Sequence, residues 1–150
     1  MAELHTIDIK RTSSAEWSGG VPQGSGTIDL GSGAFHGKYS FNTRMGNEPG
    51  TNPEELIAGA HAACFSMALA FALTNAGHPP TSVSTHAVVH LTRTDSGFAI
   101  PKIDLVTEGV VPGIDDATFA ATAEEAKKNC PVSKVLAGAE ITLQASLKRS

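Results

Sequence analysis

Apolar and polar residues alternate along much of this chain, with the two-residue period of half-buried strands. The alternation is weak over 3–19 and continues in the short segments 25–33 and 34–44, which glycines separate. It returns in three later segments: 81–93, 101–113 and 139–150. We predict an N-terminal antiparallel meander, two further strands joined through 94–100, and a final strand.

A different pattern lies between these groups of strands and predicts one long helix. Asn52 is a good N-cap, Pro53 fits the first helical position, and Glu55 takes the capping-box position. Gly77, followed by two prolines, ends the helix, so it covers 53–76 and is roughly 35 Å long at 1.5 Å per residue. Nearly every side of it is small or apolar. We therefore expect it to be covered on most faces, by a sheet on one side and by something else on the other.

The segment 114–129 is amphipathic, with Ile114, Phe119 and Ala126 at inward positions, and 131–138 restarts as a short helix with proline first. The order is therefore strands, long helix, strands, helix, strand. This order predicts an α+β fold in a single domain, 1–150.

Composition and charge narrow the possible partners and location. The chain has 150 residues, a net charge of −4 and no basic run, so nucleic acid and anionic membranes are not expected partners. The N-terminus lacks the apolar core of a signal peptide, which favours a cytoplasmic protein. The most apolar window, 56–73, contains His61, Cys64 and Ser66 and is interpreted as a core helix rather than a membrane span.

The chain has two cysteines, and each has an ordinary structural interpretation beside a reactive one. Cys64 lies inside the apolar helix, where a cysteine commonly acts as a small hydrophobic residue. Cys130 precedes Pro131 at a helix break, where an N-cap side chain faces backbone N–H groups that favour a thiolate. In a reducing compartment, pairing of the two sulfurs is expected to be transient and catalytic rather than structural.

Other cysteine chemistry has less support from the residues. His61 and Cys64 share a helix face at i and i+3, but structural zinc needs four ligands and no second pair lies near Cys130. His61 is more typical of a packed or hydrogen-bonded histidine. A papain-like cysteine–histidine nucleophile has no second supporting feature, and no CxxC pair is present. Composition and spacing alone indicate an α+β protein with two thiols.

Four motifs carry a family resemblance. They are FNTR at 41–44, GTNPEELIAGAHAACFSMAL at 50–69, VPGID at 111–115 and NCPVSKVL at 129–136. Together they resemble the osmotically inducible protein C (OsmC) family, relatives of the organic hydroperoxide resistance proteins, over nearly the whole chain. The resemblance implies antiparallel sheets packed around a long central helix in an intertwined homodimer. It also implies a cysteine-based peroxidase for organic hydroperoxides, with H2O2 as a further candidate substrate, and no metal, haem or flavin.

The resemblance also assigns roles to particular residues. Cys64 matches the peroxidatic cysteine and Cys130 the resolving one, Arg44 matches the arginine beside the reactive sulfur, and Glu54 matches its carboxylate partner. The position of the arginine in FNTR favours the OsmC branch over the organic hydroperoxide resistance branch. The family suggests a dithiol reductant such as a lipoylated protein.

The same roles agree with elementary chemistry. A buried cysteine needs a nearby cation to stay ionised, and a guanidinium keeps its charge when desolvated but needs a carboxylate partner. We expect an apolar wall of Phe65, Met67 and Phe71 to favour the organic tail of a hydroperoxide. The main alternative is a non-enzymatic stress-response homodimer of the same fold that holds a lipid-like ligand.

The spacing between Glu54 and Cys64 predicts where the carboxylate comes from. Ten residues of straight helix separate the two by about 15 Å, too far for one arginine to contact both. Either the helix breaks between them or the glutamate near each Cys64 belongs to the partner chain. We predict the second arrangement, with the site at a two-fold interface.

Overall fold

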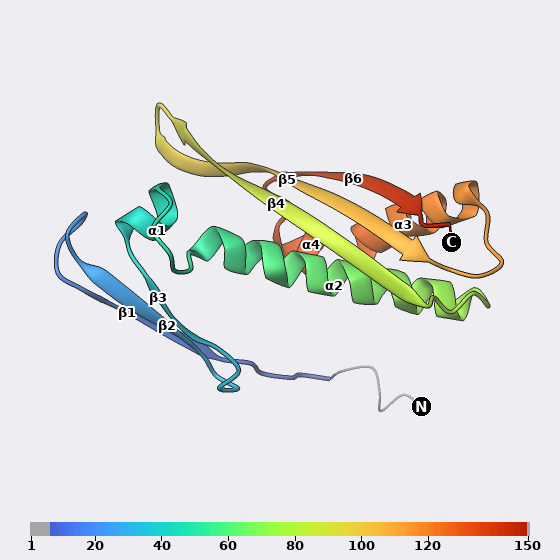
Figure 1. Cartoon of the computed structure of the whole chain (residues 1–150), viewed down its shortest axis with the longest axis horizontal. Coiled ribbons are helices and arrows are strands. Elements are labelled where there is room, and N and C mark those ends of the chain that lie inside the picture. The colour runs from blue at the N-terminus through green and yellow to red at the C-terminus, as the bar shows by residue number, and fades with distance from the viewer. Residues whose placement is uncertain (1–6, 150) are drawn as a thin grey trace. The chain divides into compact units, whose positions relative to one another are not determined.

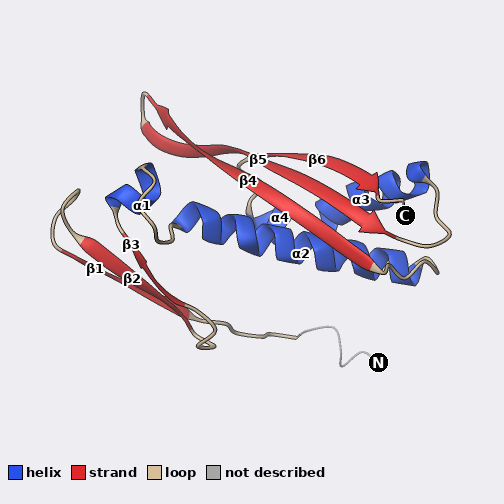
Figure 2. Cartoon of the chain, viewed as in Figure 1, coloured by secondary structure: helices blue, strands red, loops and turns tan. Residues whose placement is uncertain are grey.

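The computed structural model describes residues 7–149, and the chain divides into two compact units, Met1–Pro53 and Glu54–Ser150. The first unit contains an antiparallel sheet in the order β1-β2-β3 and a short helix, α1 (Figures 1 and 2). Its elements are β1 (Ser13–Ser18), β2 (Ser25–Leu30), β3 (His36–Tyr39) and α1 (Phe41–Met45). The predicted meander is confirmed, although the alternation over 3–6 lies outside the described residues.

The prediction of a strand over 34–44 is wrong at its end, because FNTR at 41–44 is helical. Ser40 precedes α1 with extended backbone angles, and its hydroxyl accepts a hydrogen bond from the Thr43 N–H. The Thr43 hydroxyl in turn accepts one from the Ser40 N–H. This capping box satisfies backbone donors that a strand would have paired across a sheet, and it ends the extended segment at Tyr39.

The second unit contains the long helix and a three-stranded sheet in the order β4-β5-β6. Its elements are α2 (Pro53–Asn75), β4 (Ser82–Thr94), β5 (Gly97–Val110), α3 (Asp116–Asn129), α4 (Pro131–Val135) and β6 (Glu140–Leu147). Strand β5 begins at Gly97, so most of the predicted connection 94–100 is strand instead. The turn is short because the Thr94 hydroxyl donates a hydrogen bond to the Gly97 carbonyl.

The sheet of the second unit is mixed rather than wholly antiparallel. β4 and β5 pair antiparallel across a tight turn, whereas β5 and β6 pair parallel. The chain passes through α3 and α4 between β5 and β6, and such a crossover is what a parallel pair needs. The predicted α+β class is confirmed, with this one parallel pair inside it.

The helices cover one face of this sheet. Inward-facing Ile103 and Leu105 of β5 share one hydrophobic core with Phe65 and Leu69 of α2 and Phe119 of α3. The positions that alternate with them on β5 face the other way and include the exposed Val106. All three predicted inward residues, Ile114, Phe119 and Ala126, are buried.

The opposite side of α2 is apolar and exposed. In the isolated chain Met67 is 77% exposed and Phe71 is 69% exposed, and the small residues Ala60 and Ala63 continue the same stripe. The helix is long and apolar enough to cross a membrane by length and composition, with a mean hydropathy of 1.9, and only 22% of that window is buried. The unit therefore covers α2 on one side only.

Candidate active site

Two sulfur atoms from distant parts of the chain meet in the second unit. The Sγ atoms of Cys64 on α2 and Cys130 are 2.9 Å apart, and both cysteines are free thiols. Cys64 is half-buried, whereas Cys130 is fully buried between the end of α3 and the start of α4. A pair this close can form a disulfide after a small side-chain rotation.

The surroundings of the two thiols push their pKa values in opposite directions. Burial raises the pKa of Cys64, and the hydrogen bond with Cys130 raises it further. Burial also works against the charged form of Cys130, but hydrogen bonding with Cys64 and with Ser133 outweighs it and lowers the pKa of Cys130. Within this unit Cys130 is therefore the better thiolate, and Cys64 needs a cation to ionise.

A buried histidine lies one helical turn before Cys64. His61 is 0% exposed, and its Nε2 atom is 2.8 Å from the Ser133 hydroxyl on α4. Burial lowers the pKa of His61, which keeps the imidazole neutral near pH 7. The expectation of a packed, hydrogen-bonded histidine is confirmed.

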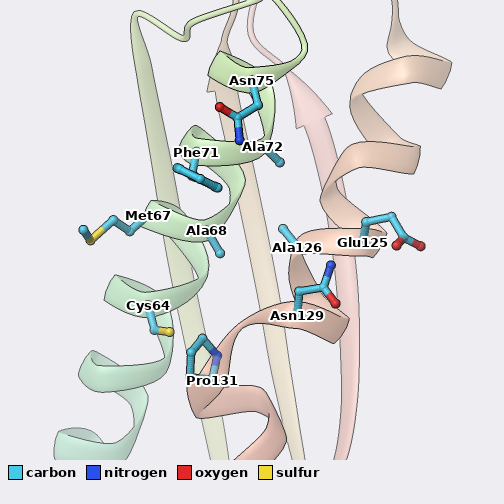
Figure 3. A pocket seen from close by; sticks show the side chains of 10 residues that line it. All are labelled: Cys64, Met67, Ala68, Phe71, Ala72, Asn75, Glu125, Ala126, Asn129 and Pro131. Carbon is cyan, nitrogen blue, oxygen red and sulfur yellow. The ribbon is translucent and has the colours of Figure 1, made fainter. Parts of the chain in front are cut away.

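A cavity of about 620 Å³ opens beside the half-buried sulfur (Figure 3). Cys64, Met67 and Phe71 of α2 form one wall, and Asn129 and the end of α3 face them across the opening. The size is typical of a small-molecule site, and the α2 wall is almost entirely apolar. Two of the three predicted wall residues are present.

Phe65 is the third predicted wall residue, and that prediction is wrong. Its side chain is fully buried in the core with Leu69, on the side of α2 that faces the sheet. Phe65 directly follows Cys64, so the helical turn of 100° per residue places the two side chains on different faces.

Arg44 and Glu54 lie outside this cavity's lining. Arg44 is exposed in the last turn of α1 and lines a separate cavity of about 310 Å³ with Trp17 and Tyr39. Glu54 is buried at the start of α2. Because α2 is unbroken from Pro53 to Asn75, Glu54 and Cys64 of one chain are separated by about 15 Å along the axis. The alternative of a helix break is thereby removed.

Comparison with known proteins shows the family to which this chain belongs. The sequence profile of the family described as OsmC-like protein matches residues 46–146. The chain is 52% identical over 143 residues to Peroxiredoxin OsmC of Escherichia coli (strain K12). This match covers 95% of this chain and 99% of that protein. The chain belongs to the OsmC family.

More distant members share the OsmC-family fold. The chain is 35% identical to an organic hydroperoxide resistance protein of Xanthomonas axonopodis pv. citri (strain 306) over 70% of this chain and 74% of that protein. The crystal structure of the organic hydroperoxide resistance protein OhrB of Bacillus subtilis superposes with a TM-score of 0.69 at 26% identity. That match covers 91% of this chain and 98% of the other.

Two residues of this OsmC-family site are not predicted by the sequence reasoning. Ser133 lies within the NCPVSKVL motif without an expected role, and Asn129 is not expected at the cavity. Their distance from Cys130 in the sequence could have indicated both residues. Ser133 lies three residues after Cys130, at the start of a helix, and Asn129 directly precedes Cys130. Within residues 7–149, no group of three or more metal-ligating side chains gathers.

Proposed function

We propose that this protein is a thiol-dependent peroxidase that reduces organic hydroperoxides to alcohols through a Cys64 sulfenate and a Cys64–Cys130 disulfide. The observation that carries the proposal is the pair of reduced sulfurs 2.9 Å apart, one of them at the wall of an apolar cavity. The printed names of the relatives, Peroxiredoxin OsmC and organic hydroperoxide resistance protein, support the same activity.

The steps balance with the two cysteines and one dithiol. The Cys64 thiolate attacks the distal peroxide oxygen, the O–O bond breaks, and the alkoxide leaves and takes a proton to become the alcohol. Cys64 is then a sulfenic acid. Cys130 attacks its sulfur, an S–S bond forms, the S–O bond breaks, and hydroxide leaves as water after taking a proton. A dithiol then reduces the disulfide and is itself oxidised, and we propose a lipoylated protein for this role.

The cavity agrees with an organic hydroperoxide as substrate. Apolar side chains of α2 line the cavity together with Cys64, namely Met67, Ala68, Phe71 and Ala72. An alkyl or aryl tail gains by leaving water for such a surface, whereas H2O2 has no tail to bury. We therefore propose that organic hydroperoxides are preferred over H2O2.

Stabilising the negative charge on Cys64 is the role that we propose for Arg44. Because burial and Cys130 both raise the pKa of Cys64, its own unit disfavours the thiolate that the first step requires. We propose that the Arg44 guanidinium stabilises this thiolate and that Glu54 holds the guanidinium. An arginine suits this position because it stays charged in a desolvated site.

The exposed stripe of α2 supports a homodimer. Met67 and Phe71 would leave water in an interface between two copies, and the small residues beside them would allow close helix approach. In that dimer we propose that Glu54 serves the Cys64 site of the partner. The two units then act as one functional domain, and the covered helix agrees with a soluble, cytoplasmic protein rather than a membrane span.

Subunit mixing tests the shared site. In a heterodimer of one Cys64→Ser chain and one Glu54→Gln chain, the only reactive sulfur lies on the chain that lacks the glutamate. If Glu54 acts across the interface, this heterodimer has one complete site and about half the hydroperoxide turnover of the wild-type dimer, although each parent homodimer is impaired. Turnover no higher than that of the parents contradicts the arrangement. Glu55→Gln replaces Glu54→Gln in the matched control, and its homodimer should retain full turnover.

Thiol counting tests the paired chemistry. One equivalent of cumene hydroperoxide should remove both thiols of each chain, and a dithiol should restore both. Cys130→Ser should lose its single thiol and, with excess peroxide, form sulfinic acid that a dithiol does not restore. Mass spectrometry of the oxidised chains measures both results. Retention of both wild-type thiols contradicts the proposal.

A ligand-binding protein remains the second candidate, because the same apolar cavity could hold a lipid-like molecule. That function needs neither cysteine to react. It predicts binding of an apolar probe that is equal in the wild type and in Cys64→Ser, together with no hydroperoxide turnover in either.

A further inference from the structure

Beyond the proposed chemistry, the chain holds one buried titratable side chain to which that chemistry assigns no step. His61 is fully buried, and its Nδ1 atom has no hydrogen-bond partner among the described residues. An unpartnered buried polar atom costs free energy that an aliphatic side chain at this position would avoid. Packing alone therefore does not explain a histidine here.

The other ring nitrogen connects His61 to the resolving thiol. Its Nε2 atom is 2.8 Å from the Ser133 hydroxyl, and Ser133 is a buried residue of α4, three positions after Cys130. Ser133 is also among the groups that lower the pKa of Cys130. Cys130 is 2.9 Å from Cys64. A buried imidazole, a hydroxyl and the sulfur pair are therefore grouped between α2 and α4.

The protonation states of these three side chains follow from counting their hydrogens. The Ser133 hydroxyl has one hydrogen, so it cannot donate to both His61 and Cys130. If the neutral imidazole carries its proton on Nε2, it donates to the Ser133 oxygen, and the hydroxyl hydrogen is then directed to the sulfur. This tautomer also leaves a lone pair rather than an N–H group unpartnered at Nδ1.

We infer that His61 is a positioning residue for the resolving step, holding the Ser133 hydroxyl so that it donates to the Cys130 sulfur and stabilises the Cys130 thiolate. This role rests on the proposed function, in which that thiolate attacks the Cys64 sulfenic acid. A stabilised thiolate would be present before peroxide arrives, which shortens the time that the sulfenic acid is exposed to further oxidation.

The proposed site places Arg44 beside Cys64, and this arginine is the same in every variant compared. Few other charged groups can act on Cys130. α2 contributes only Cys64 and His61 near the sulfur, and the inward positions of the sheet are uncharged. Glu125 of α3 and Lys134 of α4 are exposed to solvent, which screens their effect. A change in the ionisation of Cys130 in His61 variants can therefore be assigned to the contact between His61 and Ser133.

The test measures ionisation directly, without peroxide. In a Cys64→Ser background Cys130 is the only cysteine, so the ultraviolet absorbance of its thiolate against pH gives its titration midpoint. The Cys64→Ser/Cys130→Ser double variant supplies the background, including the single tyrosine. We expect His61→Leu and Ser133→Ala each to raise the midpoint by about one pH unit, the scale of one hydrogen bond. Combining them should add nothing further.

Conservative variants separate positioning from a merely structural role. His61→Gln retains an N–H group that can reach Ser133 and should keep the midpoint near that of wild-type His61, and Ser133→Thr should do the same. A lower melting temperature in His61→Leu with an unmoved midpoint overturns the inference, as do additive shifts. Should His61→Leu not fold, an unmoved midpoint in Ser133→Ala overturns it alone, because the hydroxyl is the link.

The outcomes are independent of the peroxidase proposal. A protein that does not turn over hydroperoxides can still show the shift, which would refute the function and retain the linkage. A working peroxidase whose Cys130 midpoint ignores both residues refutes only the linkage.

Discussion

Replacing Cys64 with serine is expected to reduce hydroperoxide turnover to the uncatalysed rate. The sulfur accepts the peroxide oxygen and later bonds to Cys130, and a hydroxyl can do neither because it is a poor nucleophile at neutral pH and forms no disulfide. Consumption of tert-butyl hydroperoxide with a dithiol measures the loss. The variant should fold, since Cys64 is half-buried and serine has nearly the same shape.

Two controls make this result specific. The melting temperature and circular dichroism of Cys64→Ser should match those of the wild type, and its remaining thiol at Cys130 should survive one equivalent of peroxide. Turnover that persists at the wild-type rate in a folded Cys64→Ser protein would end the peroxidase proposal. Ligand binding in the apolar cavity would then be the remaining candidate function.

Replacing Arg44 with alanine is expected to slow the attack on hydroperoxide by about ten- to a hundredfold at pH 7, the range that a hydrogen bond to a charged group represents. Burial and Cys130 already raise the pKa of Cys64, so loss of the guanidinium leaves a larger fraction as the unreactive thiol. Single-turnover measurements of sulfenate formation, trapped by a sulfenate-specific reagent, isolate this step.

The pH dependence gives the direction of the effect. Because the thiolate reacts, the rate rises with pH until the pH passes the pKa of Cys64, and a higher pKa shifts that rise to higher pH. Arg44→Ala should therefore approach the wild-type rate as the pH increases. Arg11→Ala, which removes an exposed arginine of the same unit, is the matched control and should keep the wild-type profile. Equal profiles in all three proteins would refute the role of Arg44.

The long helix shows how much of the fold the local sequence decides. Its start at Pro53 and its end near Gly77 agree with bounds predicted from a proline and a glycine, which act within one turn of the chain. The strand predicted at FNTR is wrong for a related reason. There the alternation and a capping box compete, and the reciprocal bonds of Ser40 and Thr43 prevail.

For the candidate site, local sequence decides less and packing between distant elements decides more. The motif around each cysteine is local, and the family resemblance that these motifs carry is enough to indicate both sulfurs. The 2.9 Å approach of two residues 66 positions apart depends on α3 and α4 returning the chain to α2, as does the link from His61 to Ser133. Such approaches depend on packing between elements, which hydrophobic period and capping do not encode.

The amino-acid sequence by itself determined the α+β class, the bounds of the long helix and the two candidate sulfurs, because caps, periods and motifs act through neighbouring residues. Only the tertiary structure decided the parallel pairing of β6, the burial of Phe65 away from the cavity, and the contact between His61 and Ser133. Each of these depends on which surfaces meet when distant segments pack, and that is a property of the whole fold.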